Sequence, residues 1–585
     1  MPLPRRIALY VVVALLVALY CLGADAEIRN DSHWWRMAIA GVSAVWVVAY
    51  AIAKGLPEQS RVWGMEAVRS LMLATVVFGW FNYYQFDKKV LDGIGDSVDI
   101  TYYYTNSKYM EELGYFGLYP AFLLADKEFK QRHPLCPPGK RSRKCIYQYR
   151  DLRDYDVKPV SVALEHAEQI KRDNFTPERW EEFKRDVDFF LRAKSTRMMA
   201  SNFYVDHGYN PPPTWTLVGG ALANMADVDH IKSIARVDIY LVAAMFIGVI
   251  WAFGFDTFLW ASLFFVCTFS GRWPILGEAL LRFDWVACLV LAMCFWKKEK
   301  YAVAGGLMAY AGLNRIFPMI FFFGWGIVAL MDTVRTRKLL PEHIRFVGGA
   351  ALVGVILVGG ALGKYGPDTF RDSTKNLLMH NKSYSSHRVG LGDLVLFRGE
   401  QTRKEMALTT YVHPDGKVTK GIAAKELKIQ EMQPLLRLAA LAALVFLSLY
   451  VWRTKRRDVW ALLPLAILPF YAATNPQINY YNLRLMLFVW HGYSVATDEK
   501  PRFFHRVALL ILFAGEFATQ WAFLTPHPEG SGLVERYYVT CTTSVWMAAY
   551  LALLVGRLFQ EGWLQKQDSV ESVGLGASTS GTIGG

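Results

Sequence analysis

Long apolar runs separated by short polar segments constrain the fold of this chain more than any other feature of its sequence. Of its 585 residues, 53% are hydrophobic and 15% are aromatic. Fourteen of the runs are candidate membrane-spanning helices, and several are shorter than the ~20 residues that a bilayer normally requires. The sequence therefore predicts an all-α polytopic membrane protein with about 13–14 transmembrane helices. The candidate spans are 7–23, 36–53, 67–84, 236–254, 257–270, 284–296, 301–314, 316–331, 346–362, 434–452, 459–473, 480–494, 506–523 and 542–557.

Two long polar segments divide the predicted membrane helices into three groups. The first segment predicts an amphipathic helix over 160–200 with a helix start at Pro177, and the second predicts a β-hairpin around Asp415-Gly416. The C-terminal residues are rich in Ser, Gly and Thr, a composition typical of a disordered tail. The predicted parts are the first three transmembrane helices (1–84), an extracytoplasmic loop (85–235), the fourth to ninth helices (236–362), a second extracytoplasmic loop (363–433), the remaining helices (434–557) and a disordered cytoplasmic tail (558–585).

Lys and Arg gather in alternate short turns, and this pattern predicts how the chain is oriented in the membrane. Basic turns lie at 297–300, 335–338 and 453–457, and the intervening short turns carry few positive charges. Because cytoplasmic loops are enriched in Lys and Arg, we place these turns inside, together with the N-terminus. Both large loops then face outside. This predicts a protein of the cell (inner) membrane whose site faces the periplasm or exterior, or the lumen of the endoplasmic reticulum in a eukaryote.

The net charge of +13 comes largely from these basic turns. No nucleic-acid-binding motif accompanies the charge, so we expect no nucleic acid partner. Basic turns beside membrane spans instead suit contact with anionic membrane lipids.

Two cysteines of the first outer loop, Cys136 and Cys145, lie on either side of a Pro-Pro-Gly turn. In an extracytoplasmic loop they predict a disulfide. A zinc site is the weaker interpretation, because no second Cys or His pair with metal-ligand spacing accompanies them.

Two acids, Asp96 and Asp99, follow the third predicted span and lie near the start of a predicted helix. The side chain of Asp96 can cap this helix, and we keep both acids as catalytic candidates. On a helix, Tyr102, Tyr103 and Asn106 share the face of Asp99. A carboxylate among aromatic rings is suited to take a proton from a sugar hydroxyl while the rings pack on sugar faces. The alternative is a solvated acid beside tyrosines of the membrane interface.

The residues from Asp99 onward resemble the first outer loop of the GT-C glycosyltransferase superfamily. The pattern is Asp99-Ile-Thr-Tyr-Tyr-Tyr, continued through Lys108, Gly114, Leu118 and Tyr119. It is most similar to the mannosyltransferases that use polyprenyl-phosphate-mannose. In that superfamily the loop aspartate is the catalytic base, and Asp99 occupies the matching position. The family usually places this aspartate after the first span, whereas here it follows the third.

A proline-rich segment before the fourth predicted span resembles a second element of that superfamily. The segment runs from Tyr209 through Asn-Pro-Pro-Pro-Thr to Trp215 and leads into an apolar helix. Prolines fix φ and remove donors, so they can turn the chain sharply at the membrane surface. We predict that Tyr209 and Trp215 bind substrate together with Tyr102 and Tyr103. An ordinary rigid loop before a span is the alternative.

Basic residues at the predicted outer edge of the membrane are candidates for binding the donor phosphate. Arg315 follows a helix that contains Gly305-Gly306 and precedes Pro318, and this pattern resembles a third element of the superfamily. Arg can grip a phosphate through two parallel hydrogen bonds. A side chain that only reaches for lipid headgroups is the alternative. The further candidates for this role are Arg272, Arg484, His380 and Arg388.

Together these patterns predict an inverting membrane glycosyltransferase. It would transfer mannose, or another hexose or pentose, from a polyprenyl-phosphate donor to a hydroxyl of a glycan, glycolipid or protein. A phosphate is already a good leaving group, so no metal or other cofactor is required, although the sequence leaves a divalent metal open. The number of spans also suits a lipid-linked oligosaccharide flippase or exporter, and a non-catalytic receptor is a third class. Most charges lie at the ends of the spans, which favours an enzyme over a carrier with charged helices at the midplane.

Overall fold

Nine helices are long and apolar enough to cross a membrane within the part of the chain that the structure describes. Each coincides with a predicted span, so the protein is an all-α integral membrane protein with many spans. The structure, a computed structural model, describes residues 3–25, 27–28, 31–86, 98–137, 139–142, 144–192, 194–277, 279–382, 387–473, 476–497, 503–528 and 532–564. The nine spans are Pro4–Leu22, Ser32–Gly55, Glu58–Tyr83, Val228–Phe253, Phe317–Thr336, Pro341–His380, Gln433–Thr454, Phe503–Leu524 and Val534–Leu564.

The other five predicted spans are shorter helices that are mostly buried within the bundle. For example, α15 (Phe255–Cys267) is buried at nearly every position from Thr257 onward. A helix enclosed by other helices need not match the thickness of the bilayer, because its ends contact protein rather than lipid. The others are α17 (Asp284–Lys297), α18 (Tyr301–Asn314), α26 (Val459–Leu462) with η5 (Leu463–Ala466) and α27 (Ile467–Ala473), and α28 (Leu485–Thr497), which follows η6 (Ile478–Arg484).

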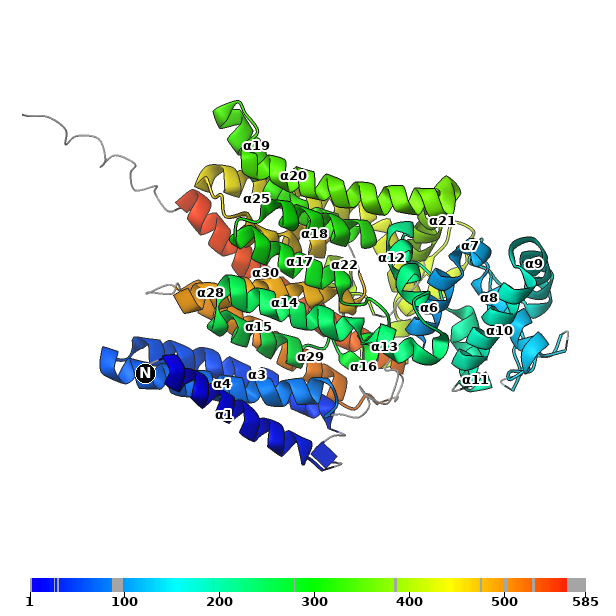
Figure 1. The fold of residues 1–585 in the computed structure, drawn as a ribbon, viewed down its shortest axis with the longest axis horizontal. Helices are drawn as coiled ribbons and strands as arrows, with labels where there is room; N and C mark the ends of the chain where they lie inside the picture. The colour runs from blue at the N-terminus through cyan, green and yellow to red at the C-terminus, as the bar shows by residue number, and fades with distance from the viewer. Residues whose placement is uncertain are drawn as a thin grey trace, which may run out of the picture.

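The long helices lie side by side, with α1, α3 and α4 along one edge of the bundle and α20 and α21 along the opposite edge (Figure 1). The helix continues from α20 into α21 without a break. The chain turns within α21 at Gly366, whose φ is 77°, just before Pro367. The long elements are α1 (Leu3–Leu22), α3 (Ser32–Gly55), α4 (Glu58–Tyr83), α14 (Val237–Phe253), η3 (Phe317–Phe322), α19 (Phe323–Thr336), α20 (Pro341–Gly354), η4 (Val355–Gly359), α21 (Gly360–Lys382), α25 (Gln433–Thr454), α29 (Phe503–Leu524), α30 (Gly532–Phe559) and η7 (Gln560–Leu564).

Glycines let α18 and α20 approach each other closely. A Cβ added to Gly305 would lie 2.0 Å from the carbonyl oxygen of Phe346, and one added to Gly349 would lie 1.8 Å from that of Ala302. Small residues at such positions allow membrane helices to pack backbone against backbone. Gly305 therefore has a packing role besides its place in the GT-C-like pattern.

The described part of the first outer loop folds into a small helical domain at one end of the bundle (Figure 1). We call residues 98–205 the loop domain. Its two short strands pair antiparallel, with Gln148 opposite Pro159. Its elements are α6 (Asp99–Lys108), α7 (Met110–Leu113), α8 (Leu118–Phe129), β1 (Gln148–Arg150), β2 (Val157–Pro159), α9 (Val160–Asn174), α10 (Pro177–Leu191), α11 (Thr196–Ser201) and η1 (Phe203–Val205).

The amphipathic helix predicted over 160–200 is present as α9 and α10, with a break between them. Thr176 caps α10, since its side chain accepts a hydrogen bond from the N–H of Arg179, and Pro177 starts the helix as predicted. Cys136 and Cys145 form a disulfide in the loop domain, with their Cα atoms 5.1 Å apart.

From the loop domain the chain returns to the bundle through α12 (Pro213–Ala223), η2 (Val228–His230) and α13 (Ile231–Ala235). The turn between α15 and α17 contains the short α16 (Trp273–Leu276). The second outer loop, predicted over 363–433, begins as helix, because α21 continues to Lys382. It contains the predicted hairpin, in which β3 (Thr410–Val412) pairs antiparallel with β4 (Val418–Lys420). Its helices are α22 (Leu391–Leu396), α23 (Arg403–Ala407) and α24 (Ile422–Glu431).

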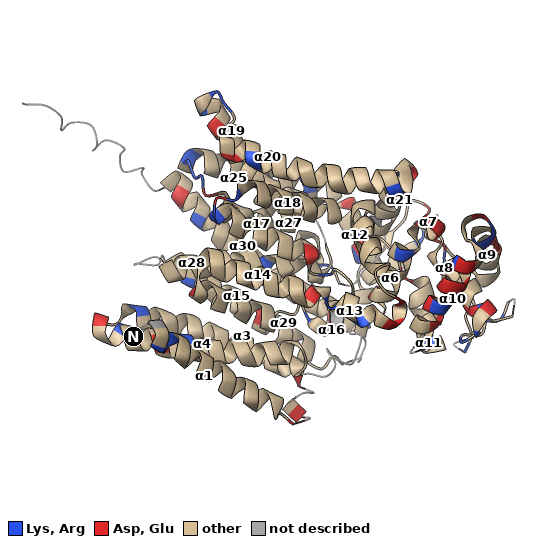
Figure 2. Cartoon of the chain, viewed as in Figure 1, with Lys and Arg blue, Asp and Glu red and all other residues tan. Residues whose placement is uncertain are grey.

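Charged side chains gather at the two ends of the bundle, with fewer between them (Figure 2). The basic turns 297–300, 335–338 and 453–457 lie at the end opposite the loop domain. This arrangement suits the predicted orientation, in which all three turns share one side of the membrane. The chain is helical to Leu564, so the prediction of a disordered tail is wrong for residues 558–564. Residues 565–585 lie outside the described residues.

Candidate active site

Asp99 lies where the loop domain meets the membrane bundle. It is the first residue of α6, and its carboxylate forms a 2.8 Å ion pair with the guanidinium of Arg282. Arg282 belongs to the turn between α15 and α17, so the pair connects the loop domain to the bundle. The Asp99 side chain is 30% exposed and that of Arg282 is 10% exposed. The carboxylate is therefore held in one orientation while part of it stays open.

Tyr103 is the second partner of Arg282. Its hydroxyl accepts a hydrogen bond from Arg282, and the guanidinium carbon lies 4.9 Å from the centre of its ring. Burial raises the pKa of Tyr103 to about 12, although Arg282 opposes the shift, so the hydroxyl stays protonated at neutral pH. The Tyr103 ring packs against Trp215, with ring centroids 5.3 Å apart, and against Tyr209 at 6.2 Å.

Arg315 lies beside the same tryptophan. It follows the last residue of α18, and its guanidinium carbon is 5.9 Å from the centre of the Trp215 ring. One terminal nitrogen donates to the carbonyl of Asn314 at 3.0 Å. Among the described residues its buried Nε has no hydrogen-bond partner, and no carboxylate forms an ion pair with it. Arg315 therefore retains donors for an anionic ligand.

The proline-rich turn holds Trp215 in place. Thr214, the residue before Trp215, donates a hydrogen bond to the carbonyl of Leu313 at the end of α18, at 2.7 Å. The Tyr209 hydroxyl is 2.7 Å from that of Thr216. Tyr209 and Trp215 are both fully buried. They form a wall behind Tyr103 rather than a surface that is open to solvent.

Tyr102 packs into the loop domain. Its ring stacks on Phe203 with centroids 4.9 Å apart, and its hydroxyl donates to the Phe203 carbonyl at 3.1 Å. Behind it lies Asp206, a second acid near the site. Burial raises the pKa of Asp206, and the negative charge of Asp99 raises it further. The position of Asp206 along the chain carries no signal of this proximity.

Two of the predicted phosphate ligands, Arg484 and Arg272, contact side chains other than those of the aromatic wall. Arg484 is fully buried and forms a 2.8 Å ion pair with Glu516, and it donates to the hydroxyl of Ser270 at 2.7 Å. An arginine neutralised in this way serves the structure of the bundle. Arg272 lies over Phe269, with its guanidinium carbon 3.7 Å from the ring centre.

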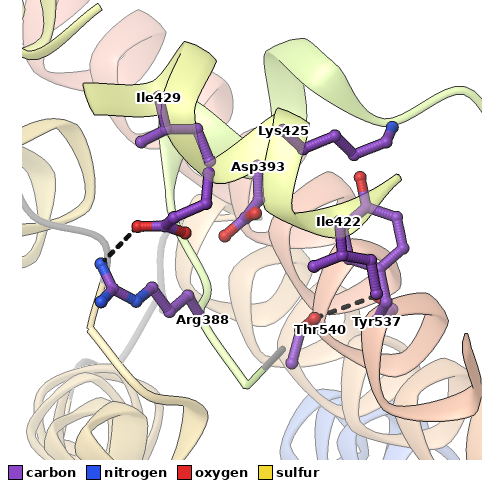
Figure 3. Close-up of a pocket in the computed structure, with 8 residues that line it drawn as sticks. Arg388, Asp393, Ile422, Lys425, Ile429, Tyr537 and Thr540 are labelled. Atoms are coloured by element: carbon purple, nitrogen blue, oxygen red, sulfur yellow. Dashed lines mark hydrogen bonds and ion pairs between the residues drawn. The ribbon is translucent and has the colours of Figure 1, made fainter. Parts of the chain in front are cut away.

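Arg388 lines a small buried pocket between the second outer loop and α30 (Figure 3). Its guanidinium forms a 3.0 Å ion pair with Glu426, drawn as a dashed line in Figure 3. Asp393 and Lys425 line the same pocket, and Lys425 is also paired with Glu400. Acids therefore balance the positive charges of this pocket, so the pocket is poorly suited to an anionic ligand.

His380 packs its ring edge-on against His207, with centroids 5.0 Å apart. Of the five predicted phosphate ligands, Arg315 is thus the one that contacts the aromatic wall beside Asp99. Asp96, the other catalytic candidate, lies outside the described residues.

One group of side chains in the described part of the chain has a geometry that could hold a metal ion. It consists of Asp332, Glu342 and His343. The group lies at the end of the bundle opposite the loop domain, and Asp332 is already paired with Arg457 and His343. A metal at this position would be remote from Asp99.

The contacts link Asp99 to Arg315 through Arg282, Tyr103 and Trp215. An acid that is open on one side and an arginine with unused donors thus flank one layer of aromatic rings. Such an arrangement can deprotonate a hydroxyl on one side and neutralise a phosphate on the other. Sequence reasoning did not assign Arg282 a role. The sequence feature that could have indicated Arg282 is its place in a predicted outer turn, two positions before an acid at the start of a span.

Comparisons of the chain with protein-family models, with curated proteins and with solved structures found no match.

Proposed function

We propose that the protein is an inverting membrane glycosyltransferase of the GT-C type. It transfers mannose, or another hexose or pentose, from a polyprenyl-phosphate donor to a hydroxyl of a glycan, glycolipid or protein on the extracytoplasmic side. The observation that carries this proposal is the Asp99–Arg282 ion pair, which adjoins the aromatic wall that Arg315 also contacts.

In the proposed reaction, the acceptor oxygen attacks the anomeric carbon of the sugar while Asp99 takes the hydroxyl proton. The new carbon–oxygen bond forms on the face opposite the donor phosphate, so the anomeric configuration inverts. The bond between the anomeric carbon and the phosphate oxygen breaks, and its electron pair leaves with polyprenyl phosphate. Arg315 stabilises the negative charge that grows on this phosphate.

Arg282 acts as a positioning residue in this scheme. Its guanidinium binds Asp99 and Tyr103 at the same time, which sets the orientation of the Asp99 carboxylate. Lysine would keep the positive charge but would lose the planar fork that makes two such contacts. Arg282→Lys should therefore lower kcat more than it raises KM.

Transfer of radiolabelled mannose from polyprenyl-phosphate-mannose to mixed acceptors, by protein purified in detergent, tests the proposal. A panel of other hexose and pentose donors covers the sugar class. Asp99→Asn should lower kcat by about 10²–10⁴-fold, the usual contribution of a general base. Glu111→Gln is the matched control, because Glu111 is an exposed acid of the neighbouring α7. Equal turnover in the two variants would refute the role of Asp99.

A further inference from the structure

A buried arginine of α3, Arg36, has no part in the proposed transfer reaction. Its side chain is fully buried, and none of its three guanidinium nitrogens has a hydrogen-bond partner among the described residues. Its electrostatic neighbours include Tyr83 at the end of α4 and Cys267 at the end of α15. Leaving a buried charge unpaired is strongly destabilising. A guanidinium in this position therefore points to an anion that is bound there.

Arg272 and Arg536 continue from Arg36 towards the surface. Arg272 is half-buried on the turn after α15, and its buried Nε also lacks a hydrogen-bond partner among the residues that the structure describes. Burial, then the positive charges of Arg36 and Arg536, lower the pKa of Arg272 to about 9. Arg536 lies near the start of α30 and is exposed. The three arginines thus form a series that runs from solvent into the protein.

Two histidines border the arginines. His33 contacts the Phe523 ring at 4.3 Å between centroids, and the Arg272 guanidinium carbon lies 5.4 Å from the same ring. The His387 ring is 3.5 Å from a terminal nitrogen of Arg536. Burial, then the charges of Arg536 and Arg272, lower the pKa of His387 to about 4, so this ring is neutral at physiological pH.

Among the residues that the structure describes, acids offset little of this positive charge. Glu535 opposes the repulsion at Arg272, and it adjoins Arg536 in the sequence. The buried Glu516 of α29 is already engaged by Arg484 at 2.8 Å and by the N–H of Phe269 at 3.2 Å. Positive charge therefore predominates among the described side chains around Arg272.

We propose that Arg36, Arg272 and Arg536 bind a phosphate group, in a site separate from Asp99 and Arg315. Guanidinium groups match phosphate oxygens through paired, charge-assisted hydrogen bonds. Arg36 and Arg536 lie near the starts of two candidate membrane spans, Ser32–Gly55 and Val534–Leu564. The ligand class is a phosphate ester of a lipid headgroup or free phosphate. The site does not depend on sugar transfer, so either proposal can fail without the other.

Thermal unfolding of the purified full-length protein in dodecyl maltoside micelles, which contain no phosphate, tests this site. One arm adds inorganic phosphate, and the other adds phosphatidic acid to the micelles, with diacylglycerol of the same chains as the uncharged control. The variants are Arg36→Gln and Arg272→Gln. The control is Arg437→Gln, an exposed arginine near the start of α25 at the same end of the bundle.

We expect the melting temperature of the wild-type protein to rise with the concentration of at least one phosphate probe. Each cluster variant should need at least about tenfold more of that probe to reach the same rise in melting temperature, because a charged hydrogen bond is lost. Arg437→Gln should respond as the wild-type protein does. Without ligand, Arg36→Gln should melt at or above the wild-type temperature, because the unpaired buried charge is gone.

The two arms distinguish the source of the ligand. A response to inorganic phosphate assigns free phosphate, and a response to phosphatidic acid alone assigns a lipid headgroup. The proposal is overturned if neither probe stabilises the wild-type protein, or if both cluster variants respond as the wild type does. In that case the carbonyl groups at the C-terminal end of α15 suffice to stabilise Arg36. If Arg36→Gln does not fold, the test depends on whether Arg272→Gln responds more weakly to the phosphate probe than Arg437→Gln does.

Discussion

Lys108 and Asp186 form a buried ion pair that ties α6, and with it Asp99, to α10. The Lys108 Nζ lies 2.7 Å from Asp186, and the two side chains are 3% and 5% exposed. Lys108 also contacts Glu182 at 2.8 Å, and the Tyr109 hydroxyl donates to Asp186 at 2.8 Å. Solvent screens the pair very little, so the cost of each substitution depends on which charge it leaves behind.

Lys108→Met leaves the Asp186 carboxylate buried with one neutral donor, Tyr109. We expect it to lower the free energy of unfolding of the loop domain by about 3–5 kcal/mol, the usual cost of breaking a buried pair. Asp186→Asn leaves Lys108 paired with Glu182, so we expect a smaller loss of about 1.5–3 kcal/mol, equivalent to one charged hydrogen bond. The double variant Lys108→Met/Asp186→Leu removes both charges and should lose less than Lys108→Met alone.

Proteolysis at low protease concentration in detergent measures these differences, because cleavage of the loop domain then follows the population of its unfolded form. Arg172→Met is the matched control. Arg172 forms a 3.1 Å pair with Asp173, but the side chains are 72% and 49% exposed, and such surface pairs contribute about 0–1 kcal/mol. The reasoning is refuted if Lys108→Met loses no more stability than Arg172→Met. It also fails if the double variant is less stable than Lys108→Met.

Three further predictions concern the bundle, the site and the loop domain. Gly305→Ala should destabilise the bundle by about 1–3 kcal/mol, because its Cβ would lie 2.0 Å from a carbonyl oxygen of α20. The control is Gly348→Ala, whose Cβ meets nothing within 4 Å and which should have the melting temperature of the wild type. If both variants melt at the same temperature, the close packing of α18 on α20 is contradicted. Asp206→Asn should raise the melting temperature at pH 7 and lose this advantage near pH 4. The raised pKa of Asp206 means that the folded protein holds a proton that the unfolded chain releases above about pH 4, so stability falls as pH rises. If the difference in melting temperature between Asp206→Asn and the wild type does not vary with pH, the raised pKa of Asp206 is contradicted. Denatured protein should react with five equivalents of maleimide before reduction and seven after it, because Cys136 and Cys145 are joined, and seven before reduction would show that the bond is absent.

The membrane helices could be predicted because each apolar run is long enough to stand out against polar turns. The short helix α15 needed the structure to be understood, because its enclosure by other helices depends on contacts far apart in the chain. The break before α10 has a local signal, the Thr176-Pro177 pair, which caps and starts a helix. The prediction of a helix start at Pro177 within 160–200 depended on this local signal.

The site was predictable only in part. Asp99 and Arg315 stand out in the sequence because charged residues beside apolar runs are uncommon. Adjacent residues on a helix point about 100° apart, which is why Tyr103 contacts Arg282 while Tyr102 packs inside the loop domain. The pairing of Arg282 with Asp99 depends on how the loop domain docks on the bundle, and no sequence spacing encodes that.

The breakdown of the donor by the wild-type protein tests the central claim most directly. Purified protein is incubated with polyprenyl-phosphate sugars and acceptor alcohols, and polyprenyl phosphate and the anomeric configuration of the product are measured together. We predict release of polyprenyl phosphate in equal amount to a glycoside of inverted configuration. A donor that remains intact, or that proteoliposomes move unchanged across the bilayer, would contradict glycosyl transfer and would favour an exporter.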